Sequence, residues 1–220
     1  MPRAIWSGSI SFGLVNIPVK LYSAVSRKNV RFNILDAETG TRVKQKRVNP
    51  DTGEEVPYDR QVKGYELGEG RYVTVSDEEL ASLDPVAGRT IDLQEFVLQS
   101  EIDPVFYDSA YYLAPDPVAK KAYALLVHAM EAADRVGVAR FVMRTKQYLA
   151  AMRVRDGKLM LSTMVYADEV NAAEDIDGLE DIDDVELTDA ELAMAEQLID
   201  SLAQPFEPDK YEDNYLSLIH

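Results

Sequence analysis

Segments with the pattern or composition of short strands fill most of the first 166 residues, and they set the strongest limit on the fold. Ile10, Phe12 and Leu14 alternate with small or polar neighbours inside an extended stretch from Ala4 to Val25. A period of two is typical of strands with one buried face. From pattern and composition we expect further strands in residues 29–48, 62–75, 90–113, 136–154 and 159–166.

Turn-forming residues separate these strands. Asp156-Gly157 is a strong hairpin signal between the last two strands, and Asn49 to Gly53 is a dense turn cluster. Pro18 predicts an edge or a break in the first strand region. Gly8 and Gly13 indicate a bulge or a close approach of two backbones.

Helix start signals are few. Asp116 and Pro117 supply an N-cap and a first-turn proline, and a core-facing helical stripe follows at Val118, Ala122, Leu125, Leu126, Ala129 and Ala133. Capping boxes begin at Ser76 and Thr188, and the second precedes an amphipathic stripe at Leu192, Ala195, Leu198, Ile199 and Leu202. Many short strands with few helices predict an α+β protein built on a sheet or barrel.

The net negative charge is confined to one part of the chain. The net charge is −16, yet Met1–Met160 holds 22 basic and 21 acidic residues. Leu161–His220 holds 18 acidic residues and one basic residue, Lys210, so its net charge is −17. Basic residues outnumber acidic ones by 11 to 6 in Met1–Lys63 and by 7 to 1 in Arg135–Lys158. We therefore expect a domain at residues 1–170 and an acidic linker with a helical arm at residues 171–220.

Catalytic and metal chemistry has little support. The chain has no cysteine, and it carries no Gly-x-Ser-x-Gly, Walker or His-Glu-x-x-His motif. His128 falls within a predicted helix, where a structural role is expected. An EF-hand alignment places Asp175, Asp177 and Gly178 suitably but fails at the first and twelfth ligands, so a solvated linker is expected. We expect no enzyme activity, cofactor or metal.

Targeting signals are also absent from the sequence. The N-terminus lacks the pattern of a signal peptide, and no apolar run approaches the roughly 20 residues that cross a bilayer. We expect a cytoplasmic, nucleoid-associated protein without a membrane partner. The last apolar helical pattern, at Tyr211, Tyr215, Leu218 and Ile219, ends without a C-cap, so we expect the native chain to continue past His220.

Two basic segments are candidate nucleic-acid surfaces. The first comprises Arg27, Lys28, Arg31, Arg42, Lys44, Lys46 and Arg47. On a strand, Arg42, Lys44 and Lys46 share a face, and such a basic ladder suits contact with phosphates. The alternative is a solvated strand whose lysines and arginines prevent edge pairing.

The second segment comprises Arg140, Arg144, Lys146, Arg153 and Arg155. Arg140 and Arg144 share strand parity, as do Arg153 and Arg155. Salt bridges to the acidic C-terminal segment are the alternative role for these residues. That acidic segment could also shield the basic surfaces in the free protein.

The N-terminal segment is distinctive: it reads Arg3-Ala4-Ile5-Trp6-Ser7-Gly8-Ser9-Ile10-Ser11-Phe12-Gly13 and continues to Ser23. Further distinctive stretches follow in order along nearly the whole chain, at residues 47–48, 55–58, 63–66, 89–92, 95–97, 101–104, 111–113, 122–126, 149–153, 168–170, 210–211, 213 and 215. In all of these stretches the sequence resembles bacterial Ku. The resemblance implies a Ku-core β-barrel with an extended basic bridge and a C-terminal helical arm.

The resemblance also implies a function. Family members form a homodimeric ring around double-stranded DNA ends, contact mainly the sugar-phosphate backbone, and recruit an ATP-dependent DNA ligase for non-homologous end joining. The arm residues that would clasp the partner are Leu192, Leu198, Ile199, Leu202, Tyr211 and Tyr215.

Two departures limit this transfer. Many members carry Cys-x-x-Cys where this chain has Asn49-Pro50-Asp51-Thr52, so no metal knuckle is expected there. Members usually continue into a C-terminal extension, often rich in lysine, which this sequence lacks. From the residues alone, the Leu192–Leu202 stripe could instead pack on its own barrel. The basic strands could likewise belong to a barrel module that holds a phosphorylated or acidic peptide.

Overall fold

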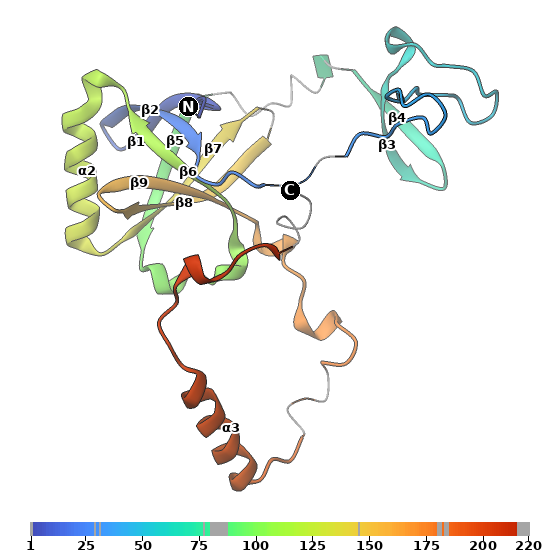
Figure 1. The fold of residues 1–220 in the computed structure, drawn as a ribbon. Helices are drawn as coiled ribbons and strands as arrows, with labels where there is room; N and C mark the ends of the chain where they lie inside the picture. Colours follow the sequence, from blue (N-terminus) through green and yellow to red (C-terminus); the bar gives the residue numbers. More distant parts are fainter. Residues whose placement is uncertain are drawn as a thin grey trace. The chain divides into compact units, whose positions relative to one another are not determined.

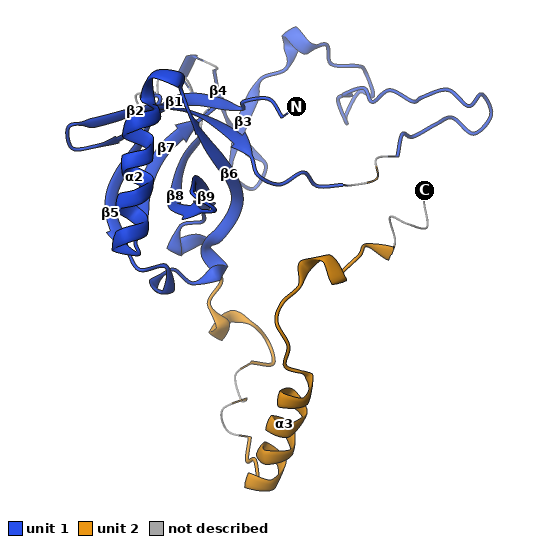
Figure 2. Ribbon diagram, turned by 60° about the vertical axis from the view of Figure 1, so that its left-hand side comes forward, with its two compact units in different colours: residues 1–28, 32–170 blue, residues 29–31, 171–220 orange. Residues whose placement is uncertain are grey.

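The computed structural model describes residues 2–28, 30, 32–76, 78–79, 88–144, 146–179, 182 and 185–214. The chain forms two compact units (Figure 2). One contains residues 1–28 and 32–170, and the other contains residues 29–31 and 171–220. Arg31 and Tyr215, both named as candidate site residues, lie outside the described residues, as does the apolar pattern of residues 215–220.

Seven strands of the first unit close into a barrel (Figure 1). In the order in which they pair around it, they are β1 (Trp6–Phe12), β2 (Val15–Ser23), β6 (Tyr107–Pro115), β9 (Lys158–Met164), β8 (Lys146–Arg155), β7 (Val136–Met143) and β5 (Thr90–Val97). Neighbours are antiparallel except β1 and β5, which close the barrel through a parallel ladder from Ser9 to Ser11. The predicted α+β barrel is confirmed.

Buried apolar side chains from the strands fill the barrel interior. Ile10, Ile17 and Leu21 from the first hairpin are fully buried with Phe141, Met152 and Leu161 from later strands. A smaller apolar cluster, around Val136, Ala151 and Met164, packs separately from this core. One face of each strand therefore supplies the main core, as the period of two predicts.

Several predicted turn positions are explained by barrel geometry. Asp156 and Gly157 both have positive φ (50° and 68°), the requirement of a type I′ hairpin turn, and the predicted hairpin is confirmed. Pro18 does not break β2. Its carbonyl accepts from the N–H of Asp116, which lies just past the end of β6, so the Pro18 nitrogen on the same side is also past the end of that strand. Its missing N–H therefore faces no partner strand. At Gly8, a Cβ would lie 2.1 Å from the Arg89 carbonyl oxygen, so the expected close approach is present.

Helix α2 (Lys120–Ala133) packs against the barrel through a face one residue away from the predicted stripe. Its buried residues are Tyr123, Leu126, Val127 and Met130, whereas Val118 and Leu125 are exposed. The Tyr123 hydroxyl donates to the Leu113 carbonyl (2.8 Å) and accepts from the Leu159 N–H (2.7 Å). Burial raises the pKa of Tyr123 above its ordinary value. Asp116 precedes the short 3-10 turn that leads into α2, but its carboxylate pairs with Lys20 instead of capping.

Between β2 and β5 the chain forms a second structure, which we call the insert (residues 32–76). Its strands are β3 (Lys63–Gly68) and β4 (Arg71–Val75), which pair only with each other. The expected strands in residues 29–48 are wrong for the described part, residues 32–48. There, only the isolated bridges Leu35–Arg42 and Val48–Glu55 form. No described residue of the insert is buried.

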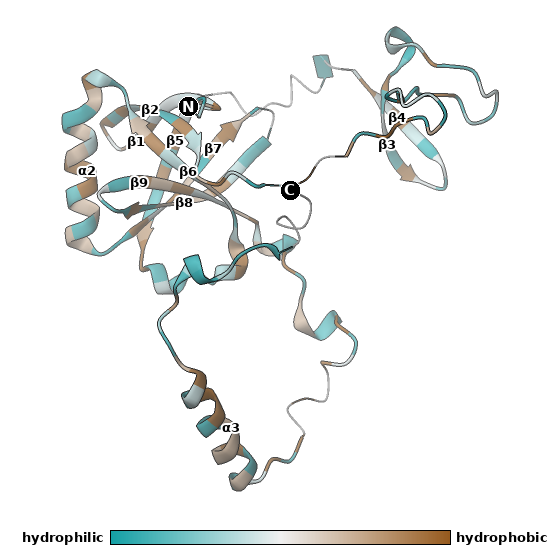
Figure 3. Ribbon diagram, in the orientation of Figure 1, coloured by the Kyte–Doolittle hydropathy of each residue, from teal (hydrophilic) through white to brown (hydrophobic). Residues whose placement is uncertain are grey.

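In the second unit, α3 (Asp189–Leu202) begins at the predicted capping box. The Thr188 hydroxyl and N–H both donate to the Glu191 carboxylate, and these bonds lower the pKa of Glu191. All of α3 is exposed, and Figure 3 shows the hydrophobic residues along it. Within the described ranges, neither α-helix combines the length and hydropathy that crossing a bilayer requires.

Short 3-10 turns complete the fold. They are Tyr58–Arg60, Gln99–Glu101, Pro104–Phe106, Pro117–Ala119, Ala167–Glu169, Ala173–Asp175 and Pro208–Lys210. The capping box at Ser76 is present, since its hydroxyl and N–H contact the Glu79 carboxylate. The helix expected beyond Glu79 falls outside the described residues.

Candidate nucleic-acid interface

Strand register brings several basic residues to one end of the barrel. Three segments lie together there: the end of β2, the start of β5 and the turn between β7 and β8. Trp6 at the start of β1 pairs with Leu21 near the end of β2, and the Trp6 indole N–H donates to the Val142 carbonyl near the end of β7 at 2.9 Å. The start of β5 pairs with β1 at Ser9. We call this the basic end. It carries the exposed residues Arg27, Lys28, Arg89, Arg144 and Lys146. Segments more than a hundred residues apart in the sequence thus present positive charge at the same end.

Arg89 was not recognised from the sequence as a site residue. It stands alone before a strand, outside both basic segments, and gains neighbours only when β1, β5 and β7 come together. The pairing of β1 with β5 brings Arg89 to the basic end. The composition of the residues around Arg89 does not predict that pairing.

The second predicted surface is divided by the structure. Arg144 lies in the β7–β8 turn with φ of 62°, so the predicted parity with Arg140 does not place the two on one strand face. Arg140 lies on β7, in register with Asp92 and Leu149. Arg153 and Arg155 lie toward the opposite end of β8 from Lys146, a span of about 30 Å between Lys146 and Arg155 at 3.3 Å per residue. Only Arg144 and Lys146 of this set belong to the basic end.

The first predicted surface is not a strand ladder. Because residues 32–48 form no extended strand, parity does not align Arg42, Lys44 and Lys46. Lys46 forms an ion pair with Glu55, and the Arg47 guanidinium donates to the Gln61 side-chain oxygen. These two side chains are therefore engaged within the insert.

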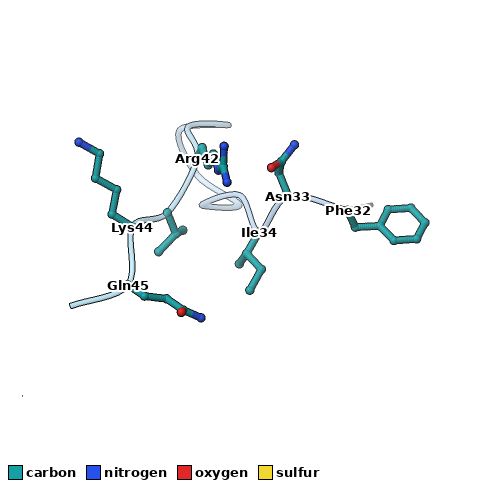
Figure 4. A pocket seen from close by; sticks show the side chains of 7 residues that line it. Phe32, Asn33, Ile34, Arg42, Lys44 and Gln45 are labelled. Atoms are coloured by element: carbon teal, nitrogen blue, oxygen red, sulfur yellow. The ribbon is translucent and has the colours of Figure 1, made fainter. Parts of the chain in front are cut away.

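Arg42 and Lys44 line a cavity of about 630 Å³ in the insert (Figure 4). Its other lining residues are Phe32, Asn33, Ile34, Val43 and Gln45. Figure 4 shows the Phe32 ring directed away from Arg42 and Lys44, so the aromatic ring and the two cations do not converge. The cavity presents charge to solvent without forming an enclosed ligand pocket.

Some of the candidate basic residues form ion pairs within the chain, and others have no carboxylate nearby. Lys146 lies 3.8 Å from Glu169 and 5.5 Å from the centre of the Tyr148 ring, and Arg155 lies 3.5 Å from Asp156. The Lys146–Glu169 contact is a salt bridge to the acidic segment, the alternative raised above. Within the part of the chain that the structure describes, no carboxylate lies within 4 Å of the charged groups of Arg27, Lys28, Arg42, Lys44, Arg89, Arg140, Arg144 or Arg153.

Unpaired guanidinium and ammonium groups on an exposed surface are suited to phosphate oxygens. Such contacts carry charge and position without reading base identity. The geometry therefore supports an interface with a nucleic-acid backbone, distributed over the basic end and the insert.

Comparison with known proteins places this geometry in context. Among solved structures, the SPOC domain of human PHD-finger protein 3 matches with a TM-score of 0.36 and 12% identity, covering 74% of this chain and 95% of that domain. No conclusion is drawn from that likeness. Among curated proteins, the non-homologous end joining protein Ku of Anaeromyxobacter sp. (strain K) is 50% identical over 97% of this chain and 71% of its own length.

Other relatives carry the same name. The Ku proteins of Symbiobacterium thermophilum and Mycobacterium tuberculosis are 46% and 42% identical, each over 97% of this chain. The chain spans 52% and 78% of their respective lengths. The family model of the Ku70/Ku80 beta-barrel domain matches residues 11–194. This chain therefore belongs to the Ku family.

Proposed function

We propose that this protein binds the ends of double-stranded DNA as a ring-shaped homodimer, largely independently of sequence, and acts in break repair by non-homologous end joining. The proposal is carried by the match over nearly the whole chain to relatives named for that process. In this proposal, residues 1–170 form the barrel and the DNA-encircling bridge, and residues 171–220 form the linker and arm.

Backbone contact is supported by the distribution of cations over the barrel and the insert, several of which have no ion pair in the described part of the chain. The predicted contacts in the described ranges are Arg27, Lys28, Arg42, Lys44, Lys46, Arg47, Arg140, Arg144, Lys146, Arg153 and Arg155. These residues lie on several elements, whereas base readout needs a compact set of side chains aimed into one groove. A distributed set of cations suits a backbone-tracking ring.

Homodimerisation is supported by apolar surface that remains exposed among the described residues of this chain. In the insert, Tyr65 and Val73 pair across β3 and β4, and both are exposed. A lone two-stranded hairpin is marginally stable in water. On α3, Leu198, Ile199 and Leu202 are each more than 60% exposed. In this proposal a second copy of the chain buries these surfaces.

The arm proposal covers Leu192, Leu198, Ile199, Leu202, Tyr211 and Tyr215. Tyr211 stacks on Phe206, with ring centres 5.8 Å apart, yet remains exposed. This pair extends the apolar surface beyond the end of α3. An arm that carries apolar surface over such a length is suited to clasp a partner subunit.

A gel-shift comparison tests end binding. Linear duplex should be retarded and a relaxed closed circle of the same sequence should not, with affinity falling steeply as salt rises. The mass of the free protein, measured by light scattering, should be that of a dimer. Equal binding to the closed circle would rule out threading. A monomer indifferent to DNA would favour a peptide-binding barrel instead.

Recruitment of an ATP-dependent DNA ligase belongs to the same proposal and rests on the family resemblance. It predicts that the protein stimulates joining of linear ends by the ligase encoded in the same genome. The control is the same ligase acting on nicked duplex, which offers no double-strand end. Equal stimulation on both substrates would argue against recruitment at ends.

A further inference from the structure

A seam between β1 and β7 opens at the basic end of the barrel. β1 pairs with β5 only from Ser9 to Ser11, and the β5–β7 register begins at Asp92 and Arg140. Before Thr90, where β5 begins, no described residue extends a strand between β1 and β7. The Trp6 indole N–H spans the gap to the Val142 carbonyl, and the Trp6 ring packs edge-on against Phe141 with centres 5.9 Å apart.

The seam leaves a cavity of about 430 Å³, which we call the seam cavity. Its lining residues are Ile5, Trp6, Ser7, Gly88, Arg89, Val142 and Arg144. None of these carries a carboxylate, and two are arginines without an ion pair in the described part of the chain. Ile5, Trp6 and Val142 supply an apolar wall beside the two guanidinium groups.

The Arg89 side of the cavity is held firmly. The Arg89 carbonyl accepts from the Ser9 N–H at 2.9 Å and lies directly against Gly8. Any larger residue at position 8 would collide with it. This contact fixes the backbone from which the Arg89 side chain extends.

The Arg144 side is strained. Arg144 occupies the left-handed region at φ of 62°, which glycine or asparagine adopts more readily than arginine. The β7–β8 hairpin would be satisfied by either of those residues. An arginine at this turn contributes nothing that the fold requires, and Arg144 lines the seam cavity.

We propose that the seam cavity binds a phosphate group of DNA, with Arg89 and Arg144 contacting its oxygens and the apolar wall contacting the adjoining sugar. Two guanidinium groups and the Ser7 hydroxyl provide donors suited to phosphate. The choice of DNA as the phosphate carrier rests on the proposed function, because the cavity lies at the same barrel end as Arg27 and Lys28. A phosphorylated peptide is the competing ligand.

The test uses the full chain and a short blunt duplex carrying either a 5′-phosphate or a 5′-hydroxyl. Arg89→Gln and Arg144→Gln should each weaken binding on the order of tenfold, and each should reduce the slope of log affinity against log salt by about 0.9. Lys121→Gln removes the same charge from an exposed position on α2 and should change neither quantity. Loss confined to the 5′-phosphate duplex identifies the terminal phosphate, and equal loss on both identifies an internal one.

Arg144→Gly separates binding from folding. Glycine suits the positive φ, so the melting temperature should hold or rise while DNA affinity still falls. Seam variants that bind both duplexes as Lys121→Gln does would overturn the inference and leave the proposed function standing. The same holds if those variants lose binding only to a phosphoserine peptide. A wild-type protein that binds neither duplex would overturn both proposals.

Discussion

Tyr123 shows how one polar atom orients an entire helix. Its hydroxyl connects the end of β6 to the start of β9 and is shielded from solvent. The apolar residues of α2 would also allow a face through Val118 and Leu125, and sequence spacing alone favours that choice. The face that forms is the one that gives the Tyr123 hydroxyl both a donor and an acceptor.

Tyr123→Phe removes both hydrogen bonds and leaves the Leu159 N–H buried without this partner. We expect a loss of about 1–3 kcal/mol in the free energy of unfolding, measured by denaturant titration. Tyr112→Phe, at an exposed position on β6, should change it little. A loss for Tyr112→Phe as large as that for Tyr123→Phe would show that the buried hydrogen bonds are not the cause.

The raised pKa of Tyr123 predicts an alkaline effect. The folded pKa of Tyr123 exceeds the ordinary value of 10.0. The contribution of the protonated hydroxyl to folding stability is therefore complete below pH 10 and is lost as pH rises through the folded pKa. The difference in stability between wild type and Tyr123→Phe should therefore shrink in strong alkali. A difference that stays constant from pH 8 to pH 11.5 would contradict the burial of this hydroxyl.

At the scale of elements, strand prediction succeeded where a partner strand exists and failed where none does. Strands form within residues 4–25 and 136–164, and the hairpin at Asp156-Gly157 was predicted. The turns at Gly13-Leu14 and at Arg144 were not, and each divides a stretch that was expected to be continuous into two paired strands. Residues 32–48 have strand-like composition but gain only isolated bridges. Alternation indicates which face of a strand would be buried, and it carries no information about whether a neighbour is available. The basic ladder expected at Arg42, Lys44 and Lys46 fails for that reason.

The arm offers a prediction of its own. Leu198→Asp places a charge in the exposed apolar stripe of α3, and we expect the dimer dissociation constant to rise by at least about tenfold. Gln197→Asp adds the same charge to the other side of the helix and should have little effect. Sedimentation velocity over a concentration series measures both. Equal dissociation constants for the two variants would remove α3 from the interface.

Across the whole molecule, charge segregation is the feature with the widest reach. Residues 161–220 carry a net charge of −17, whereas residues 1–160 carry +1. The basic end could not be predicted in the same way, because Arg89 and Arg144 meet only through barrel closure. Counting charge along the sequence finds charge-rich segments. A site assembled from single residues before β5 and after β7 depends instead on pairing between strands that are distant in the sequence.

Segregated charge predicts a change in selectivity for DNA ends. Replacing Glu174, Asp175 and Asp177 by their amides should increase binding to a closed circle at low salt, because less negative charge then repels the DNA backbone. The increase should disappear near 1 M salt, where the Debye length is about 3 Å. Gel shifts at both salt concentrations measure it. An increase that survives high salt would have another cause.

Because the insert lies between β2 and β5 in the chain, the barrel is built from two segments that a cut in the insert would separate covalently. β1 and β2 precede the insert and the other five barrel strands follow it, so a single proteolytic cut within residues 32–76 severs the only covalent link between the two groups. The ladders from β2 to β6 and from β1 to β5 survive such a cut. The two fragments should co-elute under native conditions and separate only in denaturant, so the insert could be exchanged without rebuilding the barrel.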